Sequence, residues 1–246
     1  MTRPYLTAIL HAPLASFGGL AVGERRNTGR YPTRSQIIGL LGAALGVARE
    51  DEYGQIQLRD SYSFAVQLFS PGLVGTDYHT AQMPSARGKT RFATRRDELH
   101  DKRALNTVLT SRDYRFDFLA GLAICAKADA PYKLAELADA LRLPHYTLSL
   151  GRKSCPLGWP LSPEIIDAAT PQAALATLWA RIQQDSSARK LVNGLRARPG
   201  EIILERDQFD GDPERLEFVR DQPISRRRWQ FGLREAVILI PQEVSL

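Results

Sequence analysis

Hydrophobic and polar positions along the chain mark four apolar runs of strand length and two helical segments. The strand-like runs are residues 3–11, 61–69, 116–126 and 146–150, and their apolar and aromatic content is typical of strands. Helical patterns cover residues 34–46 and 131–141, the second with Pro131 at a favoured first position. The order strand, helix, strand, strand, helix, strand predicts an α+β fold of the ferredoxin-like or RRM-like kind (βαββαβ).

A long polar segment interrupts this pattern between the second and third strands. Residues 77–112 have too few apolar positions for a core of their own, so we expect an inserted, thumb-like hairpin or loop. The charged residues 48–55 predict a turn, and residues 185–200 predict a mobile loop. A helix is expected at 171–184 and short strands at 201–206, 216–219 and 237–240. We therefore expect a main domain in residues 1–150 and a smaller, mostly β region in residues 151–246.

The helix at residues 34–46 has an unusual composition. Its apolar residues leave no polar face, which predicts a helix buried on most sides. Gly39, Gly42 and Gly46 share one face, where close approach of another backbone would offset the cost of glycine in a helix. Thr33 or Ser35 can cap the helix start, and the arginines beside it suit a phosphate. The alternative is an ordinary capped core helix with solvated arginines.

The positive charge of the chain is concentrated in two segments. The net charge is +6, yet residues 24–34 hold four arginines against one glutamate, and residues 87–112 hold eight basic against three acidic side chains. Such clustering predicts a polyanionic partner. No run approaches the roughly 18 apolar residues of a membrane span, and the N-terminus lacks a secretory signal, so we expect a cytoplasmic protein without a membrane partner. Cys125 and Cys155 form no CxxC pair, which argues against a disulfide framework.

Recognisable catalytic motifs are missing from the sequence. There is no GxSxG, HExxH, Walker loop or GxGxxG, and the four histidines lack metal-ligand spacing, so we expect neither a metal nor a cofactor. RNA cleavage without a metal needs only an acid or base and a cation near the phosphate. Tyr31, His79, Lys89 and Lys153 could supply these groups. Alternatively, His79 only hydrogen-bonds or stacks on an RNA.

Aromatic residues alternate with the basic ones. These are Phe17, Tyr31, Tyr78, Phe92 and Tyr114. Exposed rings beside arginines stack on unpaired bases, whereas duplex binding relies on phosphate contacts. Single-stranded RNA is therefore the favoured ligand, although any of these rings could instead be packed in the core. Arg226, Arg227 and Arg228 form a further basic cluster, which we interpret as solvated surface.

Four segments resemble the CasD family, the subunit at the crRNA 5′ end of the type I-E CRISPR Cascade complex. They read APLASFGG, TGRYPTRSQIIGLLGAALGVARED, DYHT and YTLSLGRKSCPLGWPL, and they span residues 12–161 in the order of the family. RDQPISRRRW near residue 220 is also similar to a late arginine segment of that family. The resemblance implies a RAMP-type protein with an RRM-like domain, a thumb-like insertion and a smaller C-terminal part.

The resemblance also implies a role and a set of contacts. The family caps the repeat-derived 5′ handle of crRNA, contacts the backbone and large subunits of the complex, and meets target DNA through that complex. The matching segments place candidate RNA contacts at Ser16, Phe17, Arg25, Arg30, Arg34, Ser35, His79, Thr80, Arg152, Lys153 and Ser154. Arg26 joins them through the basic loop, and Arg87, Lys89 and Arg91 through their place in the insertion.

Three hypotheses follow. The first is a noncatalytic subunit that caps crRNA, because the segments follow the noncleaving pattern of the family. The second is a repeat-specific ribonuclease that uses Tyr31, His79 and a lysine. The third is a structural bridge whose face of Gly39, Gly42 and Gly46 docks a protein.

Overall fold

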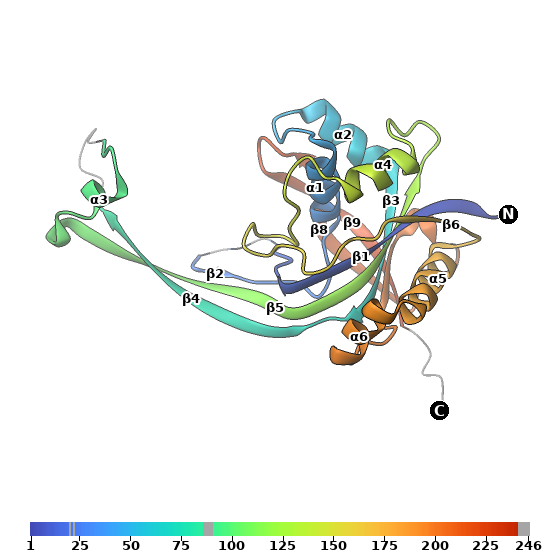
Figure 1. The fold of residues 1–246 in the computed structure, drawn as a ribbon. Helices are drawn as coiled ribbons and strands as arrows, with labels where there is room; N and C mark the ends of the chain where they lie inside the picture. The colour runs from blue at the N-terminus through green and yellow to red at the C-terminus, as the bar shows by residue number, and fades with distance from the viewer. Residues whose placement is uncertain (20, 22, 86–90, 241–246) are drawn as a thin grey trace.

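A nine-stranded sheet runs through the whole molecule (Figure 1). The computed structural model describes residues 1–19, 21, 23–85 and 91–240. The strands of the main path follow the order β6-β1-β5-β3-β7-β9-β8, and each strand on that path pairs antiparallel with its neighbours. Their bounds are β1 (Arg3–Ala15), β3 (Tyr62–Ser70), β5 (Leu105–Ala126), β6 (Glu164–Ala168), β7 (Ile202–Glu205), β8 (Arg215–Ser225) and β9 (Gln230–Leu239). The fold is a mixed α/β fold with a large antiparallel sheet.

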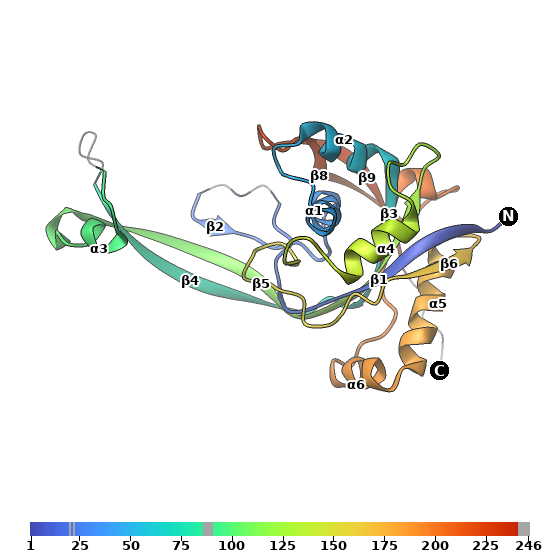
Figure 2. The ribbon, with the colours of Figure 1, turned by 45° about the horizontal axis from the view of Figure 1, so that its top comes forward.

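Helices cover both faces of the sheet. Alternate residues of a strand point to opposite faces, so Leu6 and Leu10 of β1 join one core cluster while Tyr5 and Ile9 join the other. The first cluster lies under α1 (Arg34–Leu45) and α4 (Leu134–Arg142), with α2 (Glu52–Ser61) beside them. The second lies under α5 (Pro171–Gln184) and α6 (Ser186–Gly194), and Figure 2 shows these two helices on the side of the sheet away from α1 and α4. No helix in the described part of the chain is long and apolar enough to cross a membrane.

The helix α1 confirms the predicted buried helix and corrects the role of its glycines. Thr33 and Gln36 form a capping box, and Gly46 ends the helix with a left-handed φ of 77°. A Cβ added at Gly39 would lie 3.0 Å from the Arg226 guanidinium, and one added at Gly46 would lie 2.9 Å from the ring of His145. Side chains of the same chain occupy the glycine face. The glycines therefore make room for side chains rather than for a neighbouring backbone, which corrects that part of the prediction. Docking of a partner protein on this face stays a prediction.

The predicted insertion is a long two-stranded arm (Figure 1). Strand β4 (Leu73–Pro84) pairs antiparallel with the first half of β5, and the rest of β5 continues into the centre of the sheet. The short α3 (Arg95–Glu98) and a 3-10 turn at Lys102–Ala104 lie at the far end. The two-residue strand β2 (Arg25–Arg26) adds a third strand near the body. The insertion is thus a hairpin, which is one of the two forms that were predicted for it.

Several element boundaries differ from the predictions. Residues 146–150 form no strand and contribute only the bridge of Ser149 to Pro156, whereas β6 takes the place beside β1. Helix α4 begins at Leu134 rather than at Pro131. Helix α2 begins inside the predicted charged turn, because Asp51 accepts from the Gly54 N–H. Helix α6 occupies residues 186–194 of the predicted loop at 185–200, and Asp185 accepts from two N–H groups of its first turn. The strands predicted near 201–206, 216–219 and 237–240 are confirmed as β7, β8 and β9.

Candidate nucleic-acid interface

Segments far apart in the sequence meet where the arm joins the body. Strand β2 pairs parallel with β5, with Arg25 opposite Ser111 and Arg26 opposite Arg112. On the other edge of β5, Ser111 lies opposite Tyr78 of β4. Neighbouring strands are about 4.8 Å apart, so Arg25 and Tyr78 belong to backbones about 10 Å apart. We call this region the arm base, and define it by Arg25, Arg26, Tyr78, His79, Thr80, Asp113, Tyr114 and Arg152.

A buried carboxylate lies in the middle of the arm base. Asp113 is 4% exposed, and its Oδ2 accepts from Nε and Nη2 of Arg25 at 3.3 and 3.2 Å. Its Oδ1 accepts from the hydroxyl of Thr76 at 2.8 Å. The Arg25 side chain itself remains 67% exposed. Asp113 therefore fixes the guanidinium of a surface arginine, a role that its isolated place in the sequence did not indicate.

Arg152 fastens β2 to β5 from the segment after α4. Its Nη2 donates to the Arg26 carbonyl at 3.1 Å, and its Nη1 donates to the Asp113 carbonyl at 3.0 Å. The guanidinium lies over the ring of Tyr114, 4.5 Å from the centroid, and Tyr114 is buried. Tyr114 is thus a platform for Arg152 rather than an exposed stacking ring. Lys153 and Ser154 follow at the surface.

The β4 side of the arm base presents an aromatic and a histidine. Tyr78 is 62% exposed, and Thr80 is also exposed. Nε2 of His79 lies 2.8 Å from Oδ2 of Asp77, two residues earlier on the same strand. Asp77 was not among the predicted partners of His79, although a spacing of two residues on a strand puts both side chains on one face. Phe92, nearer the tip, is 41% exposed.

Ser16 and Phe17 are buried, which corrects their prediction as surface contacts. The Phe17 ring is 1% exposed and packs edge-on against Phe118 with 4.6 Å between centroids. Ser16 is 2% exposed, and its carbonyl accepts from Nε2 of Gln36 at 2.9 Å. Both residues anchor the loop after β1 to the core. Burial of an apolar ring contributes more to the stability of the fold than leaving the ring in water, and this favours burial of Phe17.

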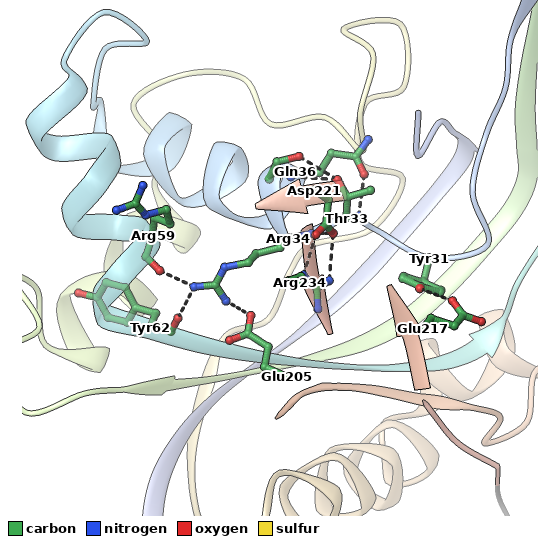
Figure 3. Close-up of polar contacts among 11 residues, drawn as sticks. Tyr31, Thr33, Arg34, Gln36, Arg59, Tyr62, Glu205, Glu217, Asp221 and Arg234 are labelled. Atoms are coloured by element: carbon green, nitrogen blue, oxygen red, sulfur yellow. Dashed lines mark hydrogen bonds and ion pairs between the residues drawn. The ribbon is translucent and has the colours of Figure 1, made fainter. Parts of the chain in front are cut away.

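Arg34 is also buried, and Figure 3 shows its contacts with Arg59, Tyr62 and Glu205. Its guanidinium forms an ion pair with Glu205 and donates to the carbonyls of Arg59 and Tyr62, the latter at 3.2 Å. Burial lowers the pKa of Arg34 to about 10, so the side chain still carries its charge at neutral pH. Arg34 stabilises the body of the protein, and its prediction as an exposed RNA contact is wrong.

The start of α1 is already occupied by an anion of the chain itself. The N–H of Arg34 donates to Oδ2 of Asp221 at 2.7 Å. Arg234 holds the same carboxylate with bonds of 2.7 and 2.9 Å, and Asp221 is 3% exposed. A helix N-terminus does favour negative charge, as predicted, but Asp221 rather than a phosphate supplies it. Ser35, next in the chain, has its carbonyl bonded to Arg226.

Arg30 and Tyr31 face β7 and β8 instead of the arm. Arg30 forms an ion pair of 3.1 Å with Glu201 and is half exposed. The Tyr31 hydroxyl donates to Oε2 of Glu217 at 2.8 Å (Figure 3). Burial, together with this carboxylate, raises the pKa of Tyr31 well above its usual range. The structure therefore separates Tyr31 from His79, two members of the predicted catalytic set.

Arg91 is the one remaining predicted contact within the described residues. Arg91 is exposed just before α3. Arg87 and Lys89 lie outside the described residues. Within the part of the chain that the structure describes, no three His, Cys, Asp or Glu side chains are grouped as metal ligands would be.

Comparison with known proteins identifies the family. A family model described as CRISPR-associated protein (Cas_Cas5) matches residues 5–237. The chain is 34% identical over 173 residues to the CRISPR system Cascade subunit CasD of Escherichia coli (strain K12), which covers 70% of this chain and 76% of that protein. A chain of a CRISPR RNA-guided surveillance complex superimposes with a TM-score of 0.62 at 21% identity, over 96% of this chain and 89% of that one. A crystal structure of a Cas protein gives 0.57 at 20% identity, over 96% and 94%. The chain therefore belongs to the CRISPR-associated Cas5 family, with the Cascade subunit CasD among its relatives.

Proposed function

We propose that this protein is a noncatalytic subunit of a type I-E Cascade complex that binds and caps the repeat-derived 5′ handle of crRNA. The observation that carries the proposal is the arm base, where Arg25, with its exposed side chain, and the exposed Tyr78 share one face of the strands, each opposite Ser111 of β5. Arg26 and Arg152 add positive charge to the same part of the arm. Cations that meet phosphates and a ring that stacks on an unpaired base are the two requirements for holding single-stranded RNA. In this role the protein bridges the backbone and large subunits and meets target DNA through the assembled complex.

The test is to incubate the purified full chain with labelled single-stranded repeat RNA, first without and then with Mg²⁺. We expect the RNA to be retained and to remain intact, with an affinity that falls steeply as salt rises. An RNA of scrambled sequence and equal length is the control for nonspecific attraction. Failure of the chain to retain repeat RNA at low salt would contradict the proposed function.

A repeat-specific ribonuclease is the second candidate, and the pair of Asp77 and His79 is the observation that favours it. A carboxylate beside an imidazole can orient the ring for acid or base work. Two observations argue against the full catalytic set. Tyr31 bonds to Glu217 on β8, and its raised pKa keeps the hydroxyl protonated at neutral pH. Discrete cleavage of repeat RNA that disappears in His79→Ala would support this candidate instead.

We also infer that β1, β3, β5 and β6 form a ferredoxin-like unit with α1 and α4 as its two crossovers. The sheet order β6-β1-β5-β3, with antiparallel pairing throughout, supports this assignment. In this unit β6, rather than residues 146–150, is the fourth strand, and the arm extends the hairpin between the second and third. In this arrangement the arm base lies on β5, a central strand of the unit, where β5 continues into the arm.

A further inference from the structure

Asp113 is an unexpected residue at a site that attracts RNA. It is a buried carboxylate among cations, and a phosphate chain passing over the arm base would be repelled by its charge. Its contacts are nevertheless numerous. Two bonds reach Arg25, one comes from Thr76, and its main-chain carbonyl accepts from Arg152. These contacts tie β2, β4 and the segment after α4 to the same residue of β5.

We propose that Asp113 is a positioning residue for RNA binding, which acts by holding the Arg25 guanidinium in its binding orientation. This inference rests on the proposed function. Both bonds from Arg25 reach one oxygen through Nε and Nη2, and the side chain stays 67% exposed. The guanidinium can therefore face a phosphate while Asp113 holds its inner edge. Thr76 fixes the second oxygen of Asp113 and so keeps the carboxylate itself from rotating.

The sign of the effect separates positioning from simple electrostatics. If Asp113 acted only through its charge, Asp113→Asn would remove a repulsion and strengthen RNA binding. If Asp113 orients Arg25, the same substitution frees a long side chain, which must then be immobilised when RNA binds. We therefore expect Asp113→Asn to weaken binding roughly two- to tenfold, a range that follows from the cost of ordering one flexible side chain. The loss occurs although the protein becomes more positive.

The experiment measures binding of labelled single-stranded repeat RNA to the full chain over a series of salt concentrations. Asp117→Asn is the matched control, because Asp117 is an exposed residue of the same strand, and asparagine tolerates its left-handed φ of 59°. This control removes the same charge without touching Arg25, so we expect equal or slightly tighter binding than the wild type. Binding by Asp113→Asn as tight as that of Asp117→Asn would overturn the positioning role.

A double-mutant cycle with Arg25→Ala tests whether Asp113 acts through Arg25. Arg25→Ala is expected to lower the salt slope by about one. In that background, Asp113→Asn should cost no further affinity, because the side chain that it orients is missing. An equal loss in both backgrounds would show a merely structural effect and overturn the proposal.

Thr76→Val supplies an independent variant should Asp113→Asn fail to fold. It removes only the hydroxyl that bonds Oδ1 of Asp113, so a smaller loss in the same direction is expected, again absent in the Arg25→Ala background. Unchanged binding by Thr76→Val, if Asp113→Asn cannot be purified, would contradict the inference. A wild-type chain that retains no repeat RNA would instead overturn the proposed function, and with it this inference.

Discussion

The arm base and the start of α1 are both built from arginines and carboxylates, yet their chemistry differs. At the start of α1, Arg34 pairs with Glu205, and Arg234 pairs with Asp221. Arg34, Glu205 and Asp221 are all buried. At the arm base, Arg25 alone pairs with the buried carboxylate of Asp113, while the side chains of Arg26 and Arg152 bond to main-chain carbonyls. Burial requires that each charge be compensated. The arm base keeps an excess of positive charge at the surface, where it can meet a polyanion.

The largest effect is expected from a substitution in the buried ion pairs at the start of α1. Arg34→Met removes the cation and leaves Glu205 buried without its partner, which should cost about 3–5 kcal/mol of unfolding free energy. Urea denaturation of the full chain measures this loss. Arg30→Met is the matched control, since its ion pair with Glu201 is half exposed and worth no more than about 1 kcal/mol. Similar losses for both variants would mean that burial does not distinguish the two arginines.

The second largest effect is expected from removal of the exposed Tyr78 ring. Tyr78→Ala should weaken repeat RNA binding by about 1–3 kcal/mol if one base stacks on this ring. Because no charge is lost, the slope of affinity against salt should stay the same. Tyr146→Ala is the control, as Tyr146 is 51% exposed but lies outside the arm base. Equal effects of the two substitutions in a fluorescence binding titration would remove Tyr78 from the interface.

Loss of one surface cation should have a smaller effect, seen mainly in the salt dependence. Arg26→Ala removes a guanidinium whose bond is to the Gly23 carbonyl, so stability should change little. Affinity should fall, and the slope against log salt should decrease by about one. Arg30→Ala should lower that slope less, because Arg30 lies against Glu201, outside the arm base. A larger change for Arg30 would shift the interface from the arm base to the loop before α1.

The smallest expected effect is a pH dependence of the free energy of unfolding that arises from Tyr31. The raised pKa of Tyr31 means that its neutral form is favoured in the folded state. Its contribution is complete below the ordinary tyrosine pKa of about 10, and it is lost as pH rises above that value. The free energy of unfolding should therefore fall less steeply between pH 10 and 11 for Tyr31→Phe than for the wild type, by under about 1 kcal/mol. Parallel curves from urea denaturation would show that Tyr31 ionises freely.

Local patterns predicted those parts of the fold that depend on neighbouring residues. Thr33, Gln36 and Gly46 are sufficient to define the ends of α1, because capping involves residues within one turn. Strand β6 was missed, and a strand was predicted at residues 146–150 instead, because residues 146–150 and 164–168 are both short and weakly patterned. Only pairing with β1 distinguishes them. Helix α6 could have been found from Asp185 as a cap before an amphipathic run.

Sequence patterns alone were enough to predict the strands β1, β3 and β5, the buried α1, the inserted arm, the concentration of positive charge and the family resemblance. It could not determine which arginines remain at the surface. That outcome depends on carboxylates from distant segments, since Asp221 reaches Arg34 from 187 residues away and Asp113 reaches Arg25 from 88. An arginine in a sequence is a charge with a long, flexible stem. Only the tertiary structure decides whether that charge is enclosed by a partner or left facing solvent, because burial and compensation are properties of the packed chain.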